Sequence, residues 1–274
     1  MTENELRLMA SRMRKKILGM SFHAGNKGAH VGPALSMVEI MAVLFGKILN
    51  LDKSDPMWPG RDRFYLSKGH GALAYYAALH EVGYLSDADI SSYDDDGGLF
   101  PAQPSMNREK GIEFSSGSLG LGLSPAIGSA LASRALGTNF KAYVILGNGE
   151  CNEGSVWEAA MSASAFRLDN LVAIVDNNEI QSDGFSRDVL DMGDMVGKWE
   201  SFGWQVRGVD GHDIPALIGA MSEQWKGKPL LLMANTVKGK GVSFMERNKD
   251  WHHNVLTKDL YELAMKEQGG LHAD

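Results

Sequence analysis

Three short, unbroken apolar runs in the second half of the chain constrain its fold more strongly than any other feature. The runs cover residues 143–146, 171–175 and 230–233, and a weaker one covers residues 204–209. Helical patterns lie before and between them, at 118–136, 154–166, 191–202 and 214–225. A strand that is apolar on both sides must be covered on both faces, so this alternation predicts an α/β fold in which helices cover both faces of a parallel sheet.

The first third of the chain has helical patterns instead. Apolar residues recur at three- and four-residue spacing over residues 6–20 and 38–49, with Ser36 placed as an N-cap of the second helix. Further helices are predicted over 72–82 and 258–267. No repeat, low-complexity tract or linker interrupts the chain. We therefore expect residues 1–274 to form a single domain with a helical N-terminal lead-in and a C-terminal extension.

Charge and composition exclude several classes of protein. A net charge of −7 and a pI near 5.6 argue against a nucleic-acid partner, which normally requires a basic face. One cysteine, Cys151, excludes an internal disulfide and fits a reducing compartment. No apolar run approaches the length of a membrane span, and the polar, acidic N-terminus has no signal-peptide core. We expect a cytoplasmic protein with no membrane partner.

The first strong strand runs directly into a glycine turn, Gly147-Asn148-Gly149-Glu150, and a helix follows from about Glu153. Glycines let a backbone approach a ligand closely, and the helix N-terminus favours negative charge, so the turn is suited to a diphosphate. Asn177-Asn178 follows the next strand, after 27 intervening residues. Both turns lie at the carboxyl ends of neighbouring strands, where side-chain and phosphate oxygens together suit Mg²⁺.

This pair of turns resembles the thiamine-diphosphate signature, which normally reads Gly-Asp-Gly followed at this spacing by an Asn pair. Further blocks resemble the N-terminal half of transketolase and run in family order over nearly the whole chain. The resemblance implies the thiamine-diphosphate-binding fold, the diphosphate-binding (PP-type) domain of transketolase. The blocks start at Gly28 (Gly-Ala-His-Val-Gly-Pro), Arg61 (Arg-Asp-Arg-Phe-Tyr-Leu-Ser-Lys-Gly-His), Ser115 (Ser-Ser-Gly-Ser-Leu-Gly), Glu153 (Glu-Gly-Ser-Val-Trp-Glu) and Thr236 (Thr-Val-Lys-Gly-Lys-Gly).

The resemblance also implies a role for each matching residue. His30, His70, His252 and Gln103 would act on the substrate. Mg²⁺, or Ca²⁺ or Mn²⁺ in its place, would be bound by the side-chain oxygens of Asn148 and Asn178 and by the carbonyl of Ile180. Glu153 would lie at the interface between two active sites. The cofactor itself would be contacted by His70, Gly117, Ser118, Leu119, Gly147, Asn148, Gly149, Glu150, Asn178 and His252.

Two positions depart from the family pattern. Asn148 stands where the family normally has a metal-binding aspartate, and an uncharged amide oxygen should attract Mg²⁺ more weakly. Gln103 stands where a Gly-His-Pro histidine contacts the donor sugar, and glutamine cannot shuttle protons near neutral pH. We therefore expect an unusual ketose donor or a specialised acceptor.

The resemblance covers only the diphosphate-binding half of transketolase. In the family, the glutamate that activates the cofactor belongs to the following, pyrimidine-binding domain, and the residues after Thr257 are too few to form that domain. The expected protein is therefore the N-terminal subunit of a split transketolase. With a C-terminal subunit, in an α2β2 assembly, it would transfer a two-carbon ketol unit between sugar phosphates.

Two other functions fit the same residues. One is a related thiamine-diphosphate enzyme subunit, such as a deoxyxylulose-phosphate synthase or a 2-oxo-acid decarboxylase or dehydrogenase. The other is a non-catalytic binding protein on the same fold. Outside the motifs, Cys151 is expected to pack in the core, and Lys238 and Lys240 either approach phosphate or lie on a solvated loop. The remaining histidines are expected to be exposed or capping: His23, His80, His212, His253 and His272.

Overall fold

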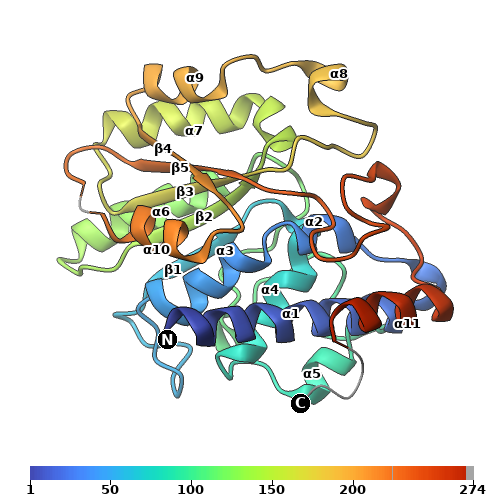
Figure 1. Ribbon diagram of the computed structural model, residues 1–274. Helices are drawn as coiled ribbons and strands as arrows, with labels where there is room; N and C mark the ends of the chain where they lie inside the picture. The colour runs from blue at the N-terminus through green and yellow to red at the C-terminus, as the bar shows by residue number, and fades with distance from the viewer. Residues whose placement is uncertain (224, 270–274) are drawn as a thin grey trace.

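The computed structural model describes residues 1–223 and 225–269, and a five-stranded parallel sheet forms its centre (Figure 1). His272, expected to be exposed or capping, lies outside the described residues. The strand order is β1-β2-β3-β5-β4, and every neighbouring pair is parallel. The predicted α/β fold is confirmed. The strands are β1 (Arg63–Leu66), β2 (Ala142–Gly147), β3 (Leu171–Asn177), β4 (Gln205–Asp210) and β5 (Leu230–Asn235).

Both faces of the sheet are buried, as the unbroken apolar runs require. Alternate residues of each central strand enter different cores. In β3, for example, Val172 and Ile174 belong to one hydrophobic cluster, and Ala173 and Val175 belong to the other. The period of two in strand geometry therefore divides each run between two helical layers.

One layer contains the helical N-terminal lead-in and lies beneath the sheet in Figure 1. A capping box between Thr2 and Glu5 begins its first helix. The last helix of the described chain packs beside that first one. This layer comprises α1 (Glu3–His23), α2 (Val31–Leu35), α3 (Val38–Val43), α4 (Ala72–Glu81), α10 (Ile214–Ser222) and α11 (Lys258–Glu267).

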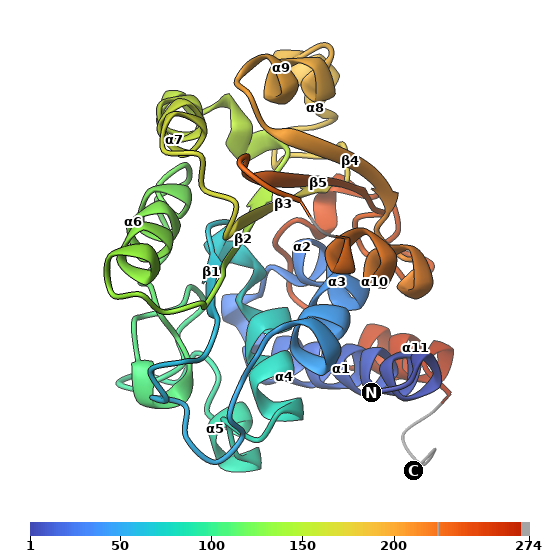
Figure 2. The ribbon, with the colours of Figure 1, turned by 90° about the vertical axis from the view of Figure 1, so that its left-hand side faces the viewer.

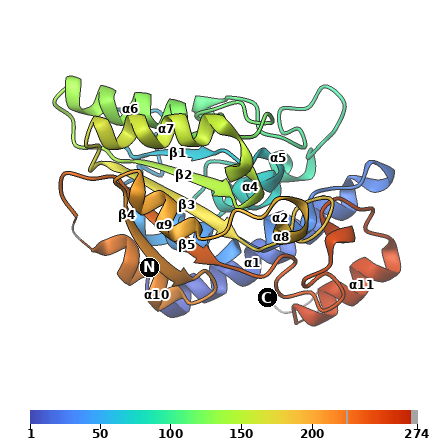
Figure 3. The same cartoon turned by 90° about the horizontal axis from the view of Figure 1, so that it is seen from above.

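The opposite face is covered by a second layer, which Figure 2 shows on the far side of the sheet from α1 and α10. Its helices α6 (Leu123–Ala135) and α7 (Gly154–Ala165) run side by side (Figure 3). A third helix, α9 (Met195–Ser201), packs on β4 and buries Trp199 completely. Cys151 is fully buried in this core, so its expected packing role is confirmed.

Short helices occupy several connections. Among them, α8 (Ser186–Leu190) lies between β3 and α9, and α5 (Asp87–Ser91) contacts α1 and α4. Within the described residues, no helix is both long enough and apolar enough to span a bilayer. The remaining short helical segments are η1 (Gly25–Lys27), η2 (Leu44–Ile48), η3 (Gly69–Gly71), η4 (Arg108–Lys110), η5 (Gly149–Asn152) and η6 (Lys249–Trp251).

One strand was not predicted, and two local predictions are wrong. Residues 63–66 form β1, although four residues carry too little periodicity to be recognised as a strand. The helix expected from residue 118 begins at Leu123, because Gly120 adopts a left-handed φ of +82° just before it. Ser36 does not cap α3; its hydroxyl donates to Pro33 O and to the Asp176 carboxylate.

Candidate active site

A cavity of about 270 Å³ opens at the carboxyl edge of the sheet. Its walls come from the turns after β1, β2 and β3, and from four other places in the chain, at residues 30–33, 103–119, 238 and 252. The structure therefore brings together residues that are far apart in the sequence. The lining includes His30, Lys68, His70, Gln103, Gly117, Leu119, Gly147, Asn148, Gly149, Glu150, Asn178, Ile180, Gln181, Asp183, Lys238 and His252.

Beneath the cavity, the carboxylate of Asp176 is fully buried at the end of β3. Its oxygens accept hydrogen bonds from Ser36 Oγ at 2.5 Å, from Asn178 Nδ2 at 3.1 Å, and from Thr236 Oγ1. The Lys68 ammonium forms an ion pair with it. Burial alone would raise the pKa of Asp176, but Lys68 and these donors outweigh burial and lower it. The carboxylate therefore stays charged and ties four segments together.

Glu150 organises the glycine turn in a similar way. Its carboxylate accepts the backbone N–H groups of Gly120 at 2.8 Å and Gly147 at 3.0 Å, and it also accepts the Ser67 hydroxyl. Burial raises the pKa of this group. Both oxygens are thus used to join the turns that form the cavity wall. Beside it, a Cβ on Gly149 would lie 2.7 Å from Gln181 Cγ, so the absence of a side chain at Gly149 lets the Gln181 side chain pack against the turn.

Three histidines converge on the cavity from separate segments. The ring centroids of His30 and His70 are 5.7 Å apart, and His252 lies 5.5 Å from His30 and 5.1 Å from His70. Burial is the main cause that lowers the pKa of His30 to about 4 and that of His252 to about 3, and it lowers the pKa of His70 well below its usual value. All three imidazoles are therefore neutral near pH 7.

Lys238 is buried behind His252, which decides between its two expected positions. Its Nζ donates to the carbonyls of Ile180 at 3.0 Å and Gln181 at 3.2 Å, and it lies 2.7 Å from His252 Nδ1. When Lys238 is protonated it has donors only, so His252 Nδ1 accepts and the ring proton is on Nε2, which makes that atom a donor. Burial, followed by the nearby Lys68 charge, lowers the pKa of Lys238 to about 7.

The three expected metal ligands border this cavity. Asn148 Nδ2 donates to Ser186 Oγ at 2.5 Å, which leaves its amide oxygen for a cation. Asn178 Oδ1 accepts the Ile180 N–H at 3.1 Å across a turn in which Glu179 adopts a left-handed φ of +63°. The Ile180 carbonyl already accepts from Lys238, so a cation there would use its second lone pair. Among the described residues, no cluster of three or more His, Cys, Asp or Glu side chains could hold a metal.

The cavity fits a polar ligand of the expected kind. His30 Nδ1 and Gln181 Nε2 are buried and have no hydrogen-bond partner. Buried polar atoms without partners are costly, so both are suited to groups that a ligand supplies. Two amide oxygens and a carbonyl match the oxygen preference of Mg²⁺. The residues therefore fit a diphosphate cofactor with a divalent cation.

The other predicted residues lie at or outside the rim. Gln103 lies against Gly117, where an added Cβ would be 2.5 Å from Gln103 Oε1, and both line the cavity with Leu119. Ser118 is exposed and lies outside the lining. Glu153 is exposed at the N-cap position of α7.

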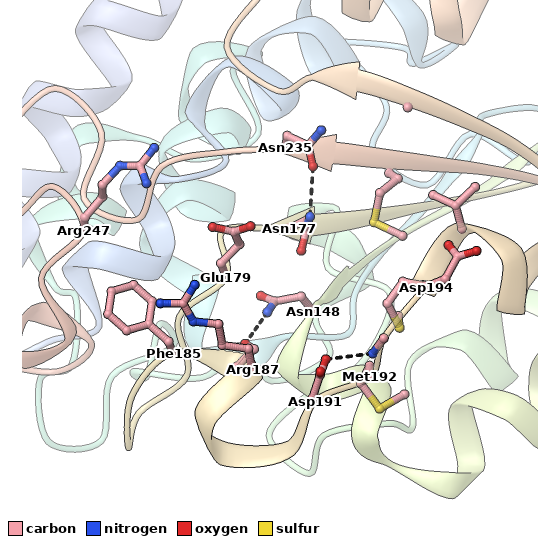
Figure 4. A pocket seen from close by; sticks show the side chains of 16 residues that line it. Asn148, Asn177, Glu179, Phe185, Arg187, Asp191, Met192, Asp194, Asn235 and Arg247 are labelled. Carbon is pink, nitrogen blue, oxygen red and sulfur yellow. Dashed lines mark hydrogen bonds between the residues drawn. The ribbon is translucent and has the colours of Figure 1, made fainter.

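A larger hollow of about 610 Å³ lies on the other side of Asn148 (Figure 4). Asn177 donates to Asn235 Oδ1 there at 2.9 Å, and Arg187 lies over the ring of Phe185. Of the predicted site residues, Asn148 alone borders both spaces. The larger volume therefore does not coincide with the convergent histidines.

Sequence reasoning missed several members of the site. Lys68 lies inside the quoted Ser-Lys-Gly-His block, and Asp176 precedes the Asn pair, so both carried a signal that could have identified them. Of the histidines expected to be exposed or capping, His253 is exposed as predicted, although its ring lies 4.5 Å from that of His30, whereas His212 is a half-buried hydrogen-bonding residue. Their partners come from distant segments, which no local pattern reveals.

Comparison with known proteins identifies the family of the chain. The family model described as "Transketolase, thiamine diphosphate binding domain" matches residues 8–274. The chain is 40% identical over 265 residues to one subunit of an apulose-4-phosphate transketolase from Actinobacillus succinogenes, covering 96% of each chain. It is also 40% identical over 240 residues to "6-deoxy-6-sulfo-D-fructose transketolase subunit SqwG" of a Clostridium species, covering 87% of each.

Solved structures give the same result for the fold. The transketolase from Leishmania mexicana superposes with a TM-score of 0.91 at 28% identity, over 97% of this chain. The transketolase from Campylobacter jejuni superposes with a TM-score of 0.92, also at 28% identity. This chain spans 41% and 43% of those two proteins, respectively.

The neutral histidines predict a loss of stability in acid. The pKa of His30 is lowered from 6.5 to about 4, so below pH 6.5 the unfolded state binds a proton that the native state does not. Stability should fall as the pH decreases from about 6.5 toward 4. We expect the melting temperature of His30→Asn to decrease less between pH 7 and pH 5 than that of the wild type. Gln103→Asn, which alters the cavity without removing a titrating group, should keep the wild-type slope; equal slopes for all three proteins would contradict this.

Proposed function

Because the chain belongs to the family of transketolase thiamine-diphosphate-binding domains, we propose that it is the N-terminal subunit of a split transketolase. In this proposal residues 1–274 form one cytoplasmic domain that binds thiamine diphosphate with Mg²⁺. The observation that carries it is the single cavity in which a glycine turn, two asparagine amides and three neutral histidines converge. A scaffold without catalysis would have no need to bury these groups together.

The lengths of the relatives support the division into subunits. Two relatives, each named as one subunit of an apulose-4-phosphate transketolase, match this chain over 96% and 93% of their own length. The transketolases from Leishmania and Campylobacter are more than twice as long as the part that this chain matches. We therefore propose a C-terminal partner subunit that carries the pyrimidine-binding domain and the activating glutamate, in an α2β2 assembly. In that assembly, exposed Glu153 would lie at the interface between two active sites.

Thiamine diphosphate, when bound, would supply the electron sink for cleavage of a ketose. The chain's own residues would orient it and the sugar. The glycine turn at 147–149, joined to neighbouring loops by Glu150, would receive the diphosphate. Asn148, Asn178 and the Ile180 carbonyl would hold the cation.

The histidines would handle the hydroxyl groups of the sugar. When Lys238 is protonated and donates to His252 Nδ1, the ring proton is on Nε2, so His252 would donate a hydrogen bond to a substrate oxygen. His30 has an unpartnered Nδ1, and His70 is neutral and lines the same wall. A neutral imidazole can accept a proton on one nitrogen and donate one from the other, as the breaking and forming of the O–H bonds of a sugar requires.

The donor is proposed to be a non-standard ketose. The relatives are named for apulose 4-phosphate and for 6-deoxy-6-sulfofructose rather than for the usual sugars. Gln103 adds an uncharged amide to the wall beside Gly117, where the family pattern has a histidine. An amide selects a substrate by fixed hydrogen bonds and takes no part in proton transfer near neutral pH.

The first test is a calorimetric titration of thiamine diphosphate, with and without Mg²⁺, into this chain and into its complex with a candidate C-terminal subunit. We expect binding that requires the metal and becomes much tighter with the partner, because the partner would complete the site. Well-folded protein that gives no heat under any of these conditions would refute the proposed function and favour a non-catalytic homologue.

A second test concerns the metal. Asn148→Asp adds a negative charge at a ligand position, and its carboxylate can still accept the Ser186 hydroxyl. We expect Mg²⁺ to support cofactor binding at a concentration lower by about tenfold, which corresponds to roughly 1.4 kcal/mol. Measurement is by cofactor titration at graded Mg²⁺. The matched control is Asn177→Asp, which adds the same charge beside Asn178 but outside the cavity lining. An unchanged or higher Mg²⁺ requirement in Asn148→Asp would contradict weak metal binding by the amide.

A third test concerns the donor. The assembled enzyme should use xylulose 5-phosphate with ribose 5-phosphate much less efficiently than an ordinary transketolase does. Gln103→His should raise that activity and lower the activity toward the native donor, because it restores a titrating group at this wall. Steady-state assays over a panel of ketose phosphates measure both. Efficient turnover of the two standard sugars by the unmodified protein would refute the donor proposal.

A further inference from the structure

The segment that carries Lys238 into the cavity is held next to that residue by a side chain, that of His212. This segment, residues 236–241, follows β5 and is called the strap here. Thr236 N still bonds to Asn177 O at 3.2 Å, and Gly239 N bonds to Gly32 O at 3.1 Å. Between them, the N–H of Val237 donates to His212 Nε2 at 2.8 Å. That bond lies one residue from Lys238.

His212 is placed against the strap by a glycine. It follows β4 in a turn in which Gly211 N bonds to Asn235 O at 2.8 Å. A Cβ on Gly211 would lie 2.4 Å from Thr236 Cγ2, so no other residue allows the turn to approach so closely. The backbone N–H of His212 in turn donates to Asp210 Oδ1 at 2.9 Å.

The hydrogen bonds fix the tautomer of His212. Because Nε2 accepts the Val237 N–H, the ring proton is on Nδ1, which donates to Glu39 Oε2 at 2.9 Å. Glu39 is buried on α3, and its other oxygen pairs with Arg14 of α1. Burial would raise the pKa of Glu39, but His212 and Arg14 together lower it, so it remains a charged acceptor.

The same network reaches the far end of the strap. Arg14 Nε donates to the carbonyl of Lys240 at 3.3 Å. This network thus connects helices α1 and α3 to the strap on both sides of Lys238, through Arg14, Glu39 and His212. On the cavity side, Lys238 Nζ is 2.7 Å from His252 Nδ1. A small shift of the strap would therefore change the contact that determines the His252 tautomer.

We propose that His212, held by Glu39, is a positioning residue for the active site: it fixes the strap so that the Lys238 ammonium contacts His252. The pair lies outside the cavity lining and would touch neither cofactor nor sugar. Its role in catalysis rests on the proposed transketolase function, whereas the mechanical link between His212 and His252 does not.

Two substitutions separate the two bonds of His212. In His212→Gln, the amide oxygen replaces Nε2 and can accept the Val237 N–H. In His212→Asn, the shorter amide replaces Nδ1; it can donate to Glu39 but cannot reach Val237. The control is His80→Asn, which breaks another histidine–carboxylate contact, 2.8 Å from Asp87, on α4 away from the strap.

The link is measured on the full-length, ligand-free chain. Amide hydrogen exchange over residues 236–241 should become faster by up to about tenfold in His212→Asn, as expected for one lost hydrogen bond. The ¹⁵N shifts of the His252 ring should change in the same variant. His212→Gln and His80→Asn should match the wild type in both measurements. If His212→Asn also matches the wild type, or if His212→Gln is altered equally, the proposal is wrong.

The catalytic consequence is measured on the complex with the C-terminal subunit. His212→Asn should weaken thiamine diphosphate binding or lower kcat by about tenfold or more, as loss of an outer-shell partner commonly does, and His212→Gln should restore it. Wild-type affinity and kcat in His212→Asn would refute the positioning role. If the wild type itself binds no cofactor, the proposed function fails instead, and the exchange and ¹⁵N measurements still decide whether the link exists.

Discussion

The buried charge of Asp176 is the constraint on which the architecture of the cavity depends. A carboxylate with no exposed surface is tolerated only when donors replace the water that it has lost. Lys68, Ser36, Asn178 and Thr236 provide those donors, and each comes from a different segment. Satisfying one side chain thus fixes the turn after β1, the junction between α2 and α3, the asparagine pair and the beginning of the strap.

A buried ion pair adjoins the neutral part of the cavity lining. Lys68, which pairs with Asp176, borders the same cavity as the neutral imidazoles and the amides. Positive charge from Lys68 contributes to lowering the pKa values of His70 and Lys238, after burial. The buried pair therefore has two effects: it holds the loops, and it favours the uncharged forms of His70 and Lys238.

The sequence predicted the sheet well because its signal is local. Each apolar run of β2, β3 and β5 was visible within a few residues, and the helix over 258–267 matched α11 at both ends. The glycine turn and the asparagine pair were expected to meet because parallel strands end at one edge, and they do meet. The family resemblance then placed His30, His70 and His252 in one site from separate blocks, which periodicity could not have done.

What the sequence could not predict depends on contacts between distant segments. Ser36 has the composition of a helix cap, yet its hydroxyl serves a carboxylate 140 residues away. His212 has no motif that distinguishes it from an exposed loop histidine, and its partners, Glu39 and Val237, are apart from it in sequence. The sequence was compatible with Lys238 on a solvated loop or in the site, and only its buried contact with His252 decides between them.

The strand order also determines when the cavity can exist. The edge strand β4 pairs with β5, which is made later and must enter between β3 and β4. Until the chain is complete beyond Asn235, β4 has no ladder to join, and pairing between strands so distant in sequence is slow. The strap begins at the next residue. The wall of the cavity that Lys238 and His252 supply is therefore assembled late, so a ribosome-bound chain carries most of both hydrophobic layers before the cavity is complete.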